Sequence, residues 1–211
     1  GGTLVCCRDI TAKAIFDAIA DEGVTHFGGA PIVLNMLVNA PAEERRAFGH
    51  VVEVFTAGAP PAPATLAKIE TMGFSVTQVC GLTETYGPAV ICAWQDDWGE
   101  KTIEEQAELK SRQGVNYHML QGISVMDSDS MTPLPHDGET QGALVTRGHW
   151  ILDAYYQSDR DSTLRDGWFD TGDIATMDKD GYITIRDRAK DIIKSGGEWI
   201  SSVELENIAI A

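Results

Sequence analysis

The alternation of strand-like and helix-like segments along residues 1–95 restricts the fold of this chain more than any other feature. Apolar side chains recur at helical spacing over Thr11–Asp21. A second helix is expected to begin at Pro63 and to end at Gly73, because helices favour proline in the first turn and glycine after the last. Strands are expected at Leu4–Cys7, Val24–Phe27 and Val51–Phe55, and a further helix at Pro31–Asn39. Strands that alternate with helices predict an α/β fold with a mostly parallel sheet.

The pattern changes after residue 95. Residues 96–114 are polar, with a short helix expected at Ile103–Ser111. Beyond them come short β-type segments separated by turn-rich stretches, at Val115–Val125, Gly142–Thr146 and Tyr182–Arg186. These segments predict a β-rich module that follows the α/β part.

The two ends of the sequence predict that this is a piece of a longer protein. Ser201 and Glu204 have the spacing of a capping box, which begins a helix. The sequence stops at Ala211, before such a helix could be stable by itself. At the other end, the sequence begins inside an expected strand.

Charge and composition exclude several classes of partner. The 211 residues carry 32 acidic and 16 basic side chains, a net charge of −16, which argues against nucleic acid or an anionic membrane. The longest apolar run, Ala89–Trp94, is far too short to span a membrane. The start of the chain lacks the features of a signal peptide. The four cysteines have no C-x-x-C spacing, so zinc is not expected, and a reducing, cytoplasmic location fits best.

Two short stretches could bind a charged small molecule. In GLTETYG, residues 81–87, a hydroxyl (Thr83) and a carboxylate (Glu84) lie between glycines that permit a sharp turn. Such a pair suits a phosphate and a Mg²⁺ ion, although a helix cap would use the same residues. In RDRAKDIIK, residues 186–194, bases outnumber acids. This run is either a solvated face or a site for an anion.

Six stretches, in this order along the chain, resemble the adenylate-forming enzymes: acyl- and aryl-CoA synthetases, peptide-synthetase adenylation domains and luciferases. They are THFGGAP (25–31), TAGAP (56–60), GLTETYG (81–87), GALVTRG (142–148), WFDTGD (168–173) and DRAKDIIKSGGEWIS (187–201). Residues 94–117 further resemble the short- and medium-chain acyl-CoA ligase branch, which includes methylmercaptopropionate-CoA ligases and plant peroxisomal acyl-activating enzymes.

The resemblance implies a division of the chain into three parts. Residues 1–95 would be an α/β sublobe of the large AMP-binding domain, and residues 96–186 a connecting helix with a β-rich sublobe. Residues 187–211 would hold the hinge and the start of a small C-terminal domain. The family's phosphate loop would then lie before Gly1 and its adenylating lysine after Ala211, so we expect this piece alone to be inactive.

The resemblance also implies a nucleotide site. Thr83 would contact phosphate, Glu84 would hold Mg²⁺, and Asp173 would accept hydrogen bonds from both ribose hydroxyls. Arg188 would contact ribose and phosphate, with Ile185 packed nearby. Gly58, Ala59, Pro60 and Cys80 are expected around the adenine, where Cys80 replaces the family's usual aromatic side chain. Gly81 and Leu82 are further expected nucleotide-binding residues.

Further residues match the family's CoA and acyl contacts. His26 matches an aromatic gate between the acyl and CoA pockets, although a histidine after a strand is often structural. Lys190 matches the hinge, and a plain surface lysine is almost equally compatible with the sequence. The residues expected to approach nucleotide and pantetheine are Lys194, Gly196, Gly197, Glu198 and Trp199.

The resemblance predicts an ATP-, Mg²⁺- and CoA-dependent ligase that converts a carboxylic acid to acyl-AMP and then to acyl-CoA. Two alternatives stay open: an adenylation domain that loads a carrier protein, and a non-catalytic module with a remnant nucleotide pocket. The sequence identifies neither the acid nor the oligomeric state.

Overall fold

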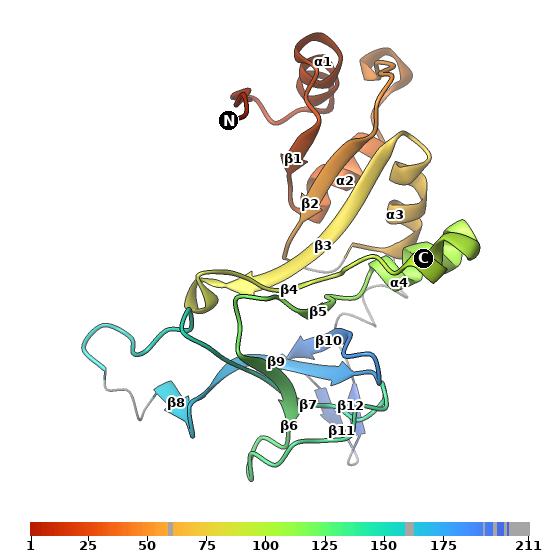
Figure 1. The fold of residues 1–211 in the computed structure, drawn as a ribbon. Coiled ribbons are helices and arrows are strands. Elements are labelled where there is room, and N and C mark those ends of the chain that lie inside the picture. Colours follow the sequence, from red (N-terminus) through yellow and green to blue (C-terminus); the bar gives the residue numbers. More distant parts are fainter. Residues whose placement is uncertain (59–60, 159–162, 192, 196–197, 201, 203–211) are drawn as a thin grey trace. The chain divides into compact units, whose positions relative to one another are not determined.

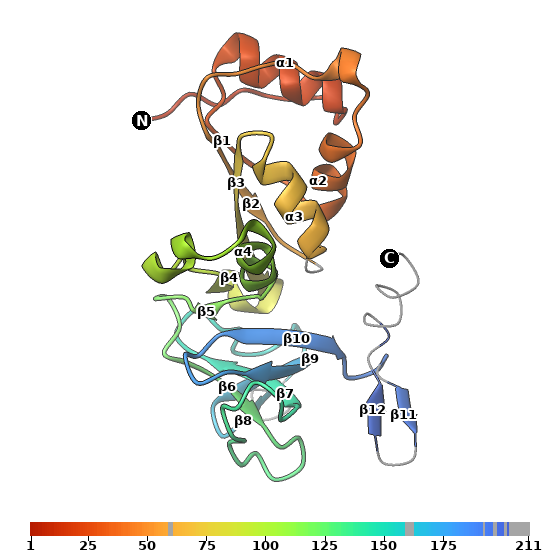
Figure 2. The same cartoon turned by 90° about the vertical axis from the view of Figure 1, so that its right-hand side faces the viewer.

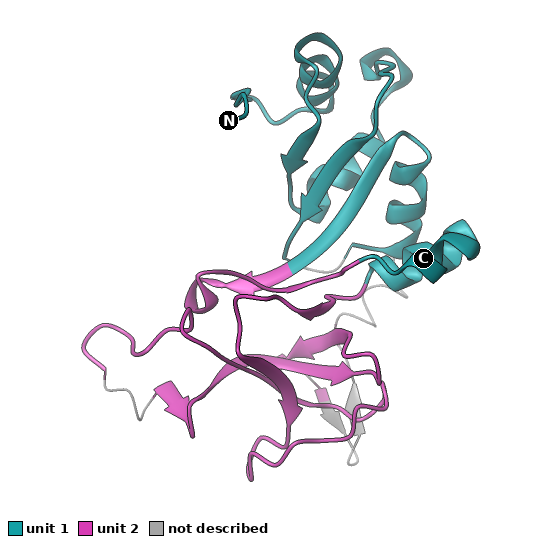
Figure 3. Cartoon of the chain, viewed as in Figure 1, with its two compact units in different colours: residues 1–79, 94–111 teal, residues 80–93, 112–211 magenta. Residues whose placement is uncertain are grey.

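The computed structural model describes residues 1–58, 61–158, 163–191, 193–195, 198–200 and 202, with only the backbone for 194, 195 and 198–200. The chain divides into two compact units, residues 1–79 with 94–111 and residues 80–93 with 112–211 (Figure 3). None of the described helices is long and apolar enough to cross a membrane.

The first unit contains a parallel sheet covered by helices. Strands β1 (His26–Gly28), β2 (Val52–Thr56) and β3 (Phe74–Leu82) lie in this order, and each pairs in parallel with its neighbour. Helices α1 (Ala12–Glu22), α2 (Pro31–Val38) and α3 (Pro63–Glu70) precede or connect them (Figure 1). The inward side chains of β2 and β3 pack with those of the helices into one core, which includes Phe16, Leu34, Leu37, Val54, Leu66 and Val76.

Local sequence explains the limits of these helices. The Thr11 hydroxyl accepts a hydrogen bond from the N–H of Ala14, and Gly23 ends α1 in the left-handed conformation, at φ 66°. The 3-10 helix η1 (Ala42–Glu44) follows α2. Residues 94–111 add the 3-10 helix η3 (Asp96–Glu100) and helix α4 (Ile103–Lys110), which begins with the capping box of Thr102 and Glu105.

The second unit is built from antiparallel strands. Its main sheet has the order β10 (Ile183–Arg188), β9 (Trp168–Met177), β7 (Gly142–Arg147), β6 (Gly122–Met126), and β8 (Leu164–Arg165) pairs with β9 (Figure 2). Strand β4 (Gly87–Ile91) pairs with β5 (Val115–Asn116), and β11 (Ile193–Ser195) with β12 (Glu198–Ile200). The core of this unit includes Val90, Val125, Leu144, Ala175, Met177 and Ile183.

The predicted fold class, a parallel α/β part followed by a β-rich module, is confirmed, but two predicted elements need correction and further strands were not predicted. Leu4–Cys7 is not a strand: the segment has no strand partner among the residues that the structure describes, and Leu4 is 87% exposed. The segment Val115–Val125 is two strands, β5 and β6, separated by a turn. Strands β4 and β9 were not predicted as strands, because glycine and proline in GLTETYGP and WFDTGD indicated turns.

Candidate functional site

The GLTETYG stretch forms a tight turn at the end of β3. Thr83–Thr85 is one turn of 3-10 helix, η2, and Tyr86 closes it at φ 54°, in the left-handed region. The hydroxyl of Thr85, which is buried, lies 2.9 Å from the Leu82 nitrogen and 2.7 Å from the Gly87 carbonyl oxygen. Thr85 therefore stabilises the turn. Of its neighbours, Thr83 is exposed and Glu84 is half-buried.

Gly81 lies so close to the returning chain that no larger residue fits. A Cβ atom at this position would be 2.1 Å from the carbonyl oxygen of Gly87 and 3.0 Å from the Cα of Pro88. Only glycine permits this close backbone approach. Its presence at the end of β3 is therefore a requirement of the turn.

Asp173 lies in β9, directly opposite Arg188 in β10. The Asp173 carboxylate is buried, with 5% of the residue exposed, and its Oδ1 lies 3.1 Å from Nε of Arg188. Burial raises the pKa of Asp173, and the nearby Arg188 guanidinium opposes that shift. The hydroxyl of Thr171 accepts a hydrogen bond from the Asp173 N–H at 3.2 Å. A carboxylate kept from water at this cost is a candidate for binding hydroxyl groups of a ligand.

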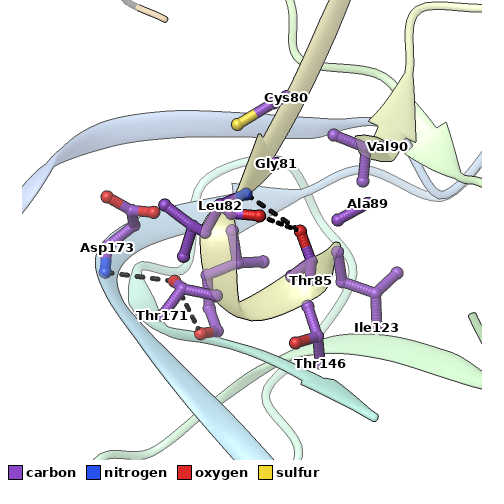
Figure 4. Close-up of a pocket in the computed structure, with 11 residues that line it drawn as sticks. Cys80, Gly81, Leu82, Thr85, Ala89, Val90, Ile123, Thr146, Thr171 and Asp173 are labelled. Atoms are coloured by element: carbon purple, nitrogen blue, oxygen red, sulfur yellow. Dashed lines mark hydrogen bonds between the residues drawn. The ribbon is translucent and has the colours of Figure 1, made fainter. Parts of the chain in front are cut away.

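The end of β3, the turn and β9 together line one small cavity (Figure 4). Its volume is about 20 Å³, room for about one water molecule, so a nucleotide would have to lie at its rim. The hydroxyl of Thr146 is fully buried and has no hydrogen-bond partner within the described residues. The lining residues include Cys80, Gly81, Leu82, Thr85, Thr146, Thr171 and Asp173.

Cys80 gives the cavity an apolar wall. Its side chain packs against the core that contains Val90 and Ile183, together with Ile185. Burial and, secondarily, the charge of Asp173 raise the pKa of the Cys80 thiol to about 11. The thiol is therefore neutral at physiological pH and acts as a small apolar side chain.

The predicted ligands fit this geometry in kind. Asp173 offers two acceptor oxygens to a pair of ribose hydroxyls, and Arg188, whose side chain is 47% exposed, offers donors to a phosphate. Within the described residues, no three His, Cys, Asp or Glu side chains gather around one point as a metal site. A Mg²⁺ ion would thus take one carboxylate, such as Glu84, with oxygens of substrate phosphates, which is its usual coordination in nucleotide sites.

The other predicted site residues are found at several places. Gly58, at φ 101°, and His26, whose Nδ1 lies 2.9 Å from the Thr25 hydroxyl, both belong to the first unit. Ala59 and Pro60 lie outside the described residues. Of the predicted residues in the second unit, Cys80, Gly81, Leu82 and Asp173 line the same cavity, and Arg188 pairs with Asp173. Thr83, Glu84 and Ile185 belong to the same unit but do not line that cavity.

The predicted hinge and CoA segment follow β10. Lys190 is exposed, in a turn where the Asp191 N–H donates to the Arg188 carbonyl at 2.9 Å. Lys194 pairs with Trp199 in the β11–β12 ladder, and Glu198 pairs with Ser195. Gly196 and Gly197 lie outside the described residues, as do Glu204 and the rest of the predicted last helix.

Sequence reasoning missed three threonines and one tyrosine of this site. Thr85, Thr146 and Thr171 line the cavity. The hydroxyl of Tyr155 donates a hydrogen bond to Oε1 of Glu84 at 2.9 Å. The GLTETYG stretch could have indicated Thr85, since a threonine hydroxyl in a tight turn commonly bonds the nearby backbone. In contrast, 71 residues separate Tyr155 from Glu84 and no local pattern joins them.

Residues 1–156 match the family model described as AMP-binding enzyme. The chain is 49% identical over 209 residues to "Acetate--CoA ligase CCL3" of Humulus lupulus, covering 98% of this chain and 37% of that protein. It is 46% identical to "Acetate/butyrate--CoA ligase AAE7, peroxisomal" of Arabidopsis thaliana, with 98% and 37% covered. The chain therefore spans little more than a third of the length of these relatives.

Solved structures share the fold. The amide bond synthetase McbA from Marinactinospora thermotolerans superposes with a TM-score of 0.76 at 26% identity, over 97% of this chain and 40% of that one. The O-succinylbenzoate coenzyme A synthetase (MenE) from Bacillus subtilis, in complex with ATP and magnesium ion, gives 0.72 at 21% identity, over 95% and 39%.

Proposed function

Because the chain belongs to the AMP-binding enzyme family, we propose that the full-length protein is an AMP-forming acyl-CoA ligase. In the proposed reaction a carboxylate oxygen attacks the α-phosphorus of ATP, which gives acyl-AMP and releases pyrophosphate. The thiol of CoA then attacks the acyl carbon and AMP leaves. The observation that carries the proposal is the buried Asp173 carboxylate, paired with Arg188, in a cavity that Gly81 and Leu82 also line.

The proposed nucleotide contacts follow from donor and acceptor chemistry. Asp173 accepts hydrogen bonds from the two ribose hydroxyls, and Arg188 donates to ribose and phosphate. The residues Cys80 to Leu82 of the second unit are the proposed lining of the adenine. These groups bind and orient the nucleotide and take no part in bond breaking, so they contribute mainly through positioning.

Thr83 and Glu84 form the proposed phosphate and metal part of the site. The Thr83 hydroxyl is exposed and free to turn toward a phosphate oxygen, and the half-buried Glu84 carboxylate supplies one ligand to the metal. A bound Mg²⁺ would neutralise the negative charge that develops on the leaving pyrophosphate. Thr85 fixes the backbone that carries both residues, because its hydroxyl bonds across the turn.

Most residues proposed for thioester formation with CoA lie near the end of the chain. Lys190 is the proposed hinge, and Lys194 with residues 196–199 is the proposed contact to nucleotide and pantetheine. His26 is the proposed gate between acyl and CoA pockets. The exposed position of Lys190 in a turn, and the exposed imidazole of His26, support roles in which a side chain or backbone must move.

Small aliphatic acids are the proposed substrates, with CoA as the acceptor. Relatives covering 98% of this chain or more are named for acetate, for acetate and butyrate, and for 2-methylpropanoate, and one is named for trans-cinnamate. All of these names specify CoA, which favours CoA over a carrier protein. A cytoplasmic location is part of the proposal, although two of these relatives are named as peroxisomal, and a fluorescent fusion of the full-length protein would test it.

The test is a two-stage assay on the full-length protein. Pyrophosphate release with acetate, butyrate, 2-methylpropanoate and cinnamate would measure acid activation, and mass spectrometry would identify the thioester formed with CoA or with a carrier protein. We expect acid-dependent pyrophosphate release and an acyl-CoA product. Pyrophosphate release without any acyl-CoA, or acylation of the carrier protein in preference to CoA, would contradict the proposal.

A further inference from the structure

A short segment after β7 contacts the turn η2 at three points within the second unit. The rings of Trp150 and Tyr86 stack, with centroids 5.2 Å apart and planes at 22°. The N–H of Leu152 donates to the main-chain carbonyl of Glu84 at 2.7 Å. The hydroxyl of Tyr155 donates to Oε1 of the Glu84 carboxylate at 2.9 Å. One segment thus holds both the backbone and the side chain of Glu84.

These contacts to the backbone and the side chain of Glu84 matter because a glutamate side chain is otherwise mobile. Its three rotatable bonds allow a half-exposed carboxylate many orientations. A metal that binds the carboxylate in only one orientation must overcome the entropy of the others. The hydrogen bond from Tyr155 removes part of that freedom before any ligand arrives. It engages Oε1 and leaves Oε2 available.

We propose that Tyr155 is the positioning residue for the Glu84 carboxylate, which it orients toward the metal of a bound Mg²⁺–ATP. The inference rests on the metal role given to Glu84 in the proposed function. Tyrosine suits this task because its hydroxyl donates a hydrogen bond without a positive charge. A lysine or arginine would compete with the cation, and within the described residues no ion pair includes Glu84.

The chain offers a matched control beside Tyr155. Tyr155 is 49% exposed and bonded to Glu84, whereas Tyr156 is 92% exposed. Replacing either residue by phenylalanine removes one hydroxyl and keeps the ring. Tyr155→Phe should therefore lose the bond to Glu84 without loss of packing, and Tyr156→Phe should lose only a solvated hydroxyl.

The experiment measures metal affinity directly in the full-length protein. Mn²⁺ would be titrated by electron paramagnetic resonance in the presence of α,β-methylene-ATP, which cannot be cleaved, and AMP binding would be measured without metal by calorimetry. We expect Tyr155→Phe to weaken Mn²⁺ binding about tenfold, within the range usual for lost partners of metal ligands. Metal-free AMP affinity should stay unchanged, and Tyr156→Phe should change neither quantity. Raising the Mg²⁺ concentration should restore the activity lost in Tyr155→Phe.

Glu84→Gln tests the metal role of Glu84 separately from the positioning role of Tyr155. If Glu84→Gln weakens Mn²⁺ binding and Tyr155→Phe does not, the positioning role of Tyr155 is wrong and the metal role of Glu84 stands. If Glu84→Gln leaves Mn²⁺ binding unchanged, both assignments are wrong. When both roles are correct, adding Tyr155→Phe to Glu84→Gln should cause no further loss, because residues that act through one contact are not additive.

Discussion

Replacing Asp173 by asparagine is expected to weaken nucleotide affinity without lowering folding stability. Only 5% of the Asp173 residue is exposed, and it lines the cavity beside Gly81, so bonds from its carboxylate to a ribose would be shielded from water. A hydrogen bond to a charged group contributes about 1.5–3 kcal/mol. Asparagine keeps the shape and removes the charge, so AMP binding should weaken roughly ten- to hundredfold.

The stability effect follows from the pKa of Asp173. Burial raises this pKa above the ordinary 3.8, and Arg188 opposes the shift without cancelling it. The folded state therefore holds the proton more tightly than the unfolded state, and stability falls as pH rises through the range just above 3.8. Above this range the charged carboxylate costs stability, so Asp173→Asn should melt at the same temperature or higher, with a flatter pH dependence just above pH 3.8.

Calorimetric titration with AMP and thermal melts at several pH values would measure both effects in the full-length protein. Asp180→Asn is the control, because Asp180 is an exposed residue paired with Lys179 at the surface. AMP affinity within twofold of the unmodified protein would refute the assigned contact to ribose. A clear fall in melting temperature would show that the ion pair with Arg188 outweighs the cost of burial.

Three further predictions concern single residues. Iodoacetamide at pH 8 should label the exposed Cys6 and should spare Cys80 until the chain unfolds. The reason is that a pKa of about 11 leaves only about a thousandth of the Cys80 thiol ionised, and equal labelling rates at the two cysteines would contradict it. Gly81→Ala should lower the unfolding free energy in urea by about 1–3 kcal/mol, and Gly99→Ala, where a Cβ meets nothing within 4 Å, should cost less. Lys190→Pro in the full-length protein should keep pyrophosphate exchange and lose thioester formation, since no described hydrogen bond uses its N–H; equal loss of both activities would leave Lys190 a plain surface residue.

The sequence predicted best where one local signal decides the structure. Helix α3 begins at Pro63 as expected, and Gly73, at φ 94°, takes the left-handed conformation just after it ends. Helix α1 covers Ala12–Glu22, within one residue of the prediction. In these helices the apolar spacing and the terminal residues favour the same boundaries, and the tertiary packing agrees with them.

Strand prediction failed where pairing partners decide the structure. Leu4–Cys7 is as apolar as many strands but has no partner among the described residues, so its backbone groups gain nothing from an extended ladder. Strand β4 begins at Gly87 and contains Pro88, two residues typical of a break, yet it is a strand because it lies between two hydrogen-bonded neighbours, β3 on one side and β5 on the other. Pairing of this kind is decided by the neighbouring strands, and the local pattern of the strand itself does not show it.

The same distinction explains what could be foreseen of the turn between β3 and β4. The glycines of GLTETYG predicted a sharp turn, and the structure has one, with Gly81 against the backbone of Gly87. Of the two interpretations of this stretch, the structure bears on the structural cap, and the binding loop stays a prediction. The Thr85 hydroxyl faces inward and bonds the backbone, as a cap does, whereas Thr83 stays exposed. The orientation of Glu84 depends on a tyrosine 71 residues away, so this last feature required the folded chain.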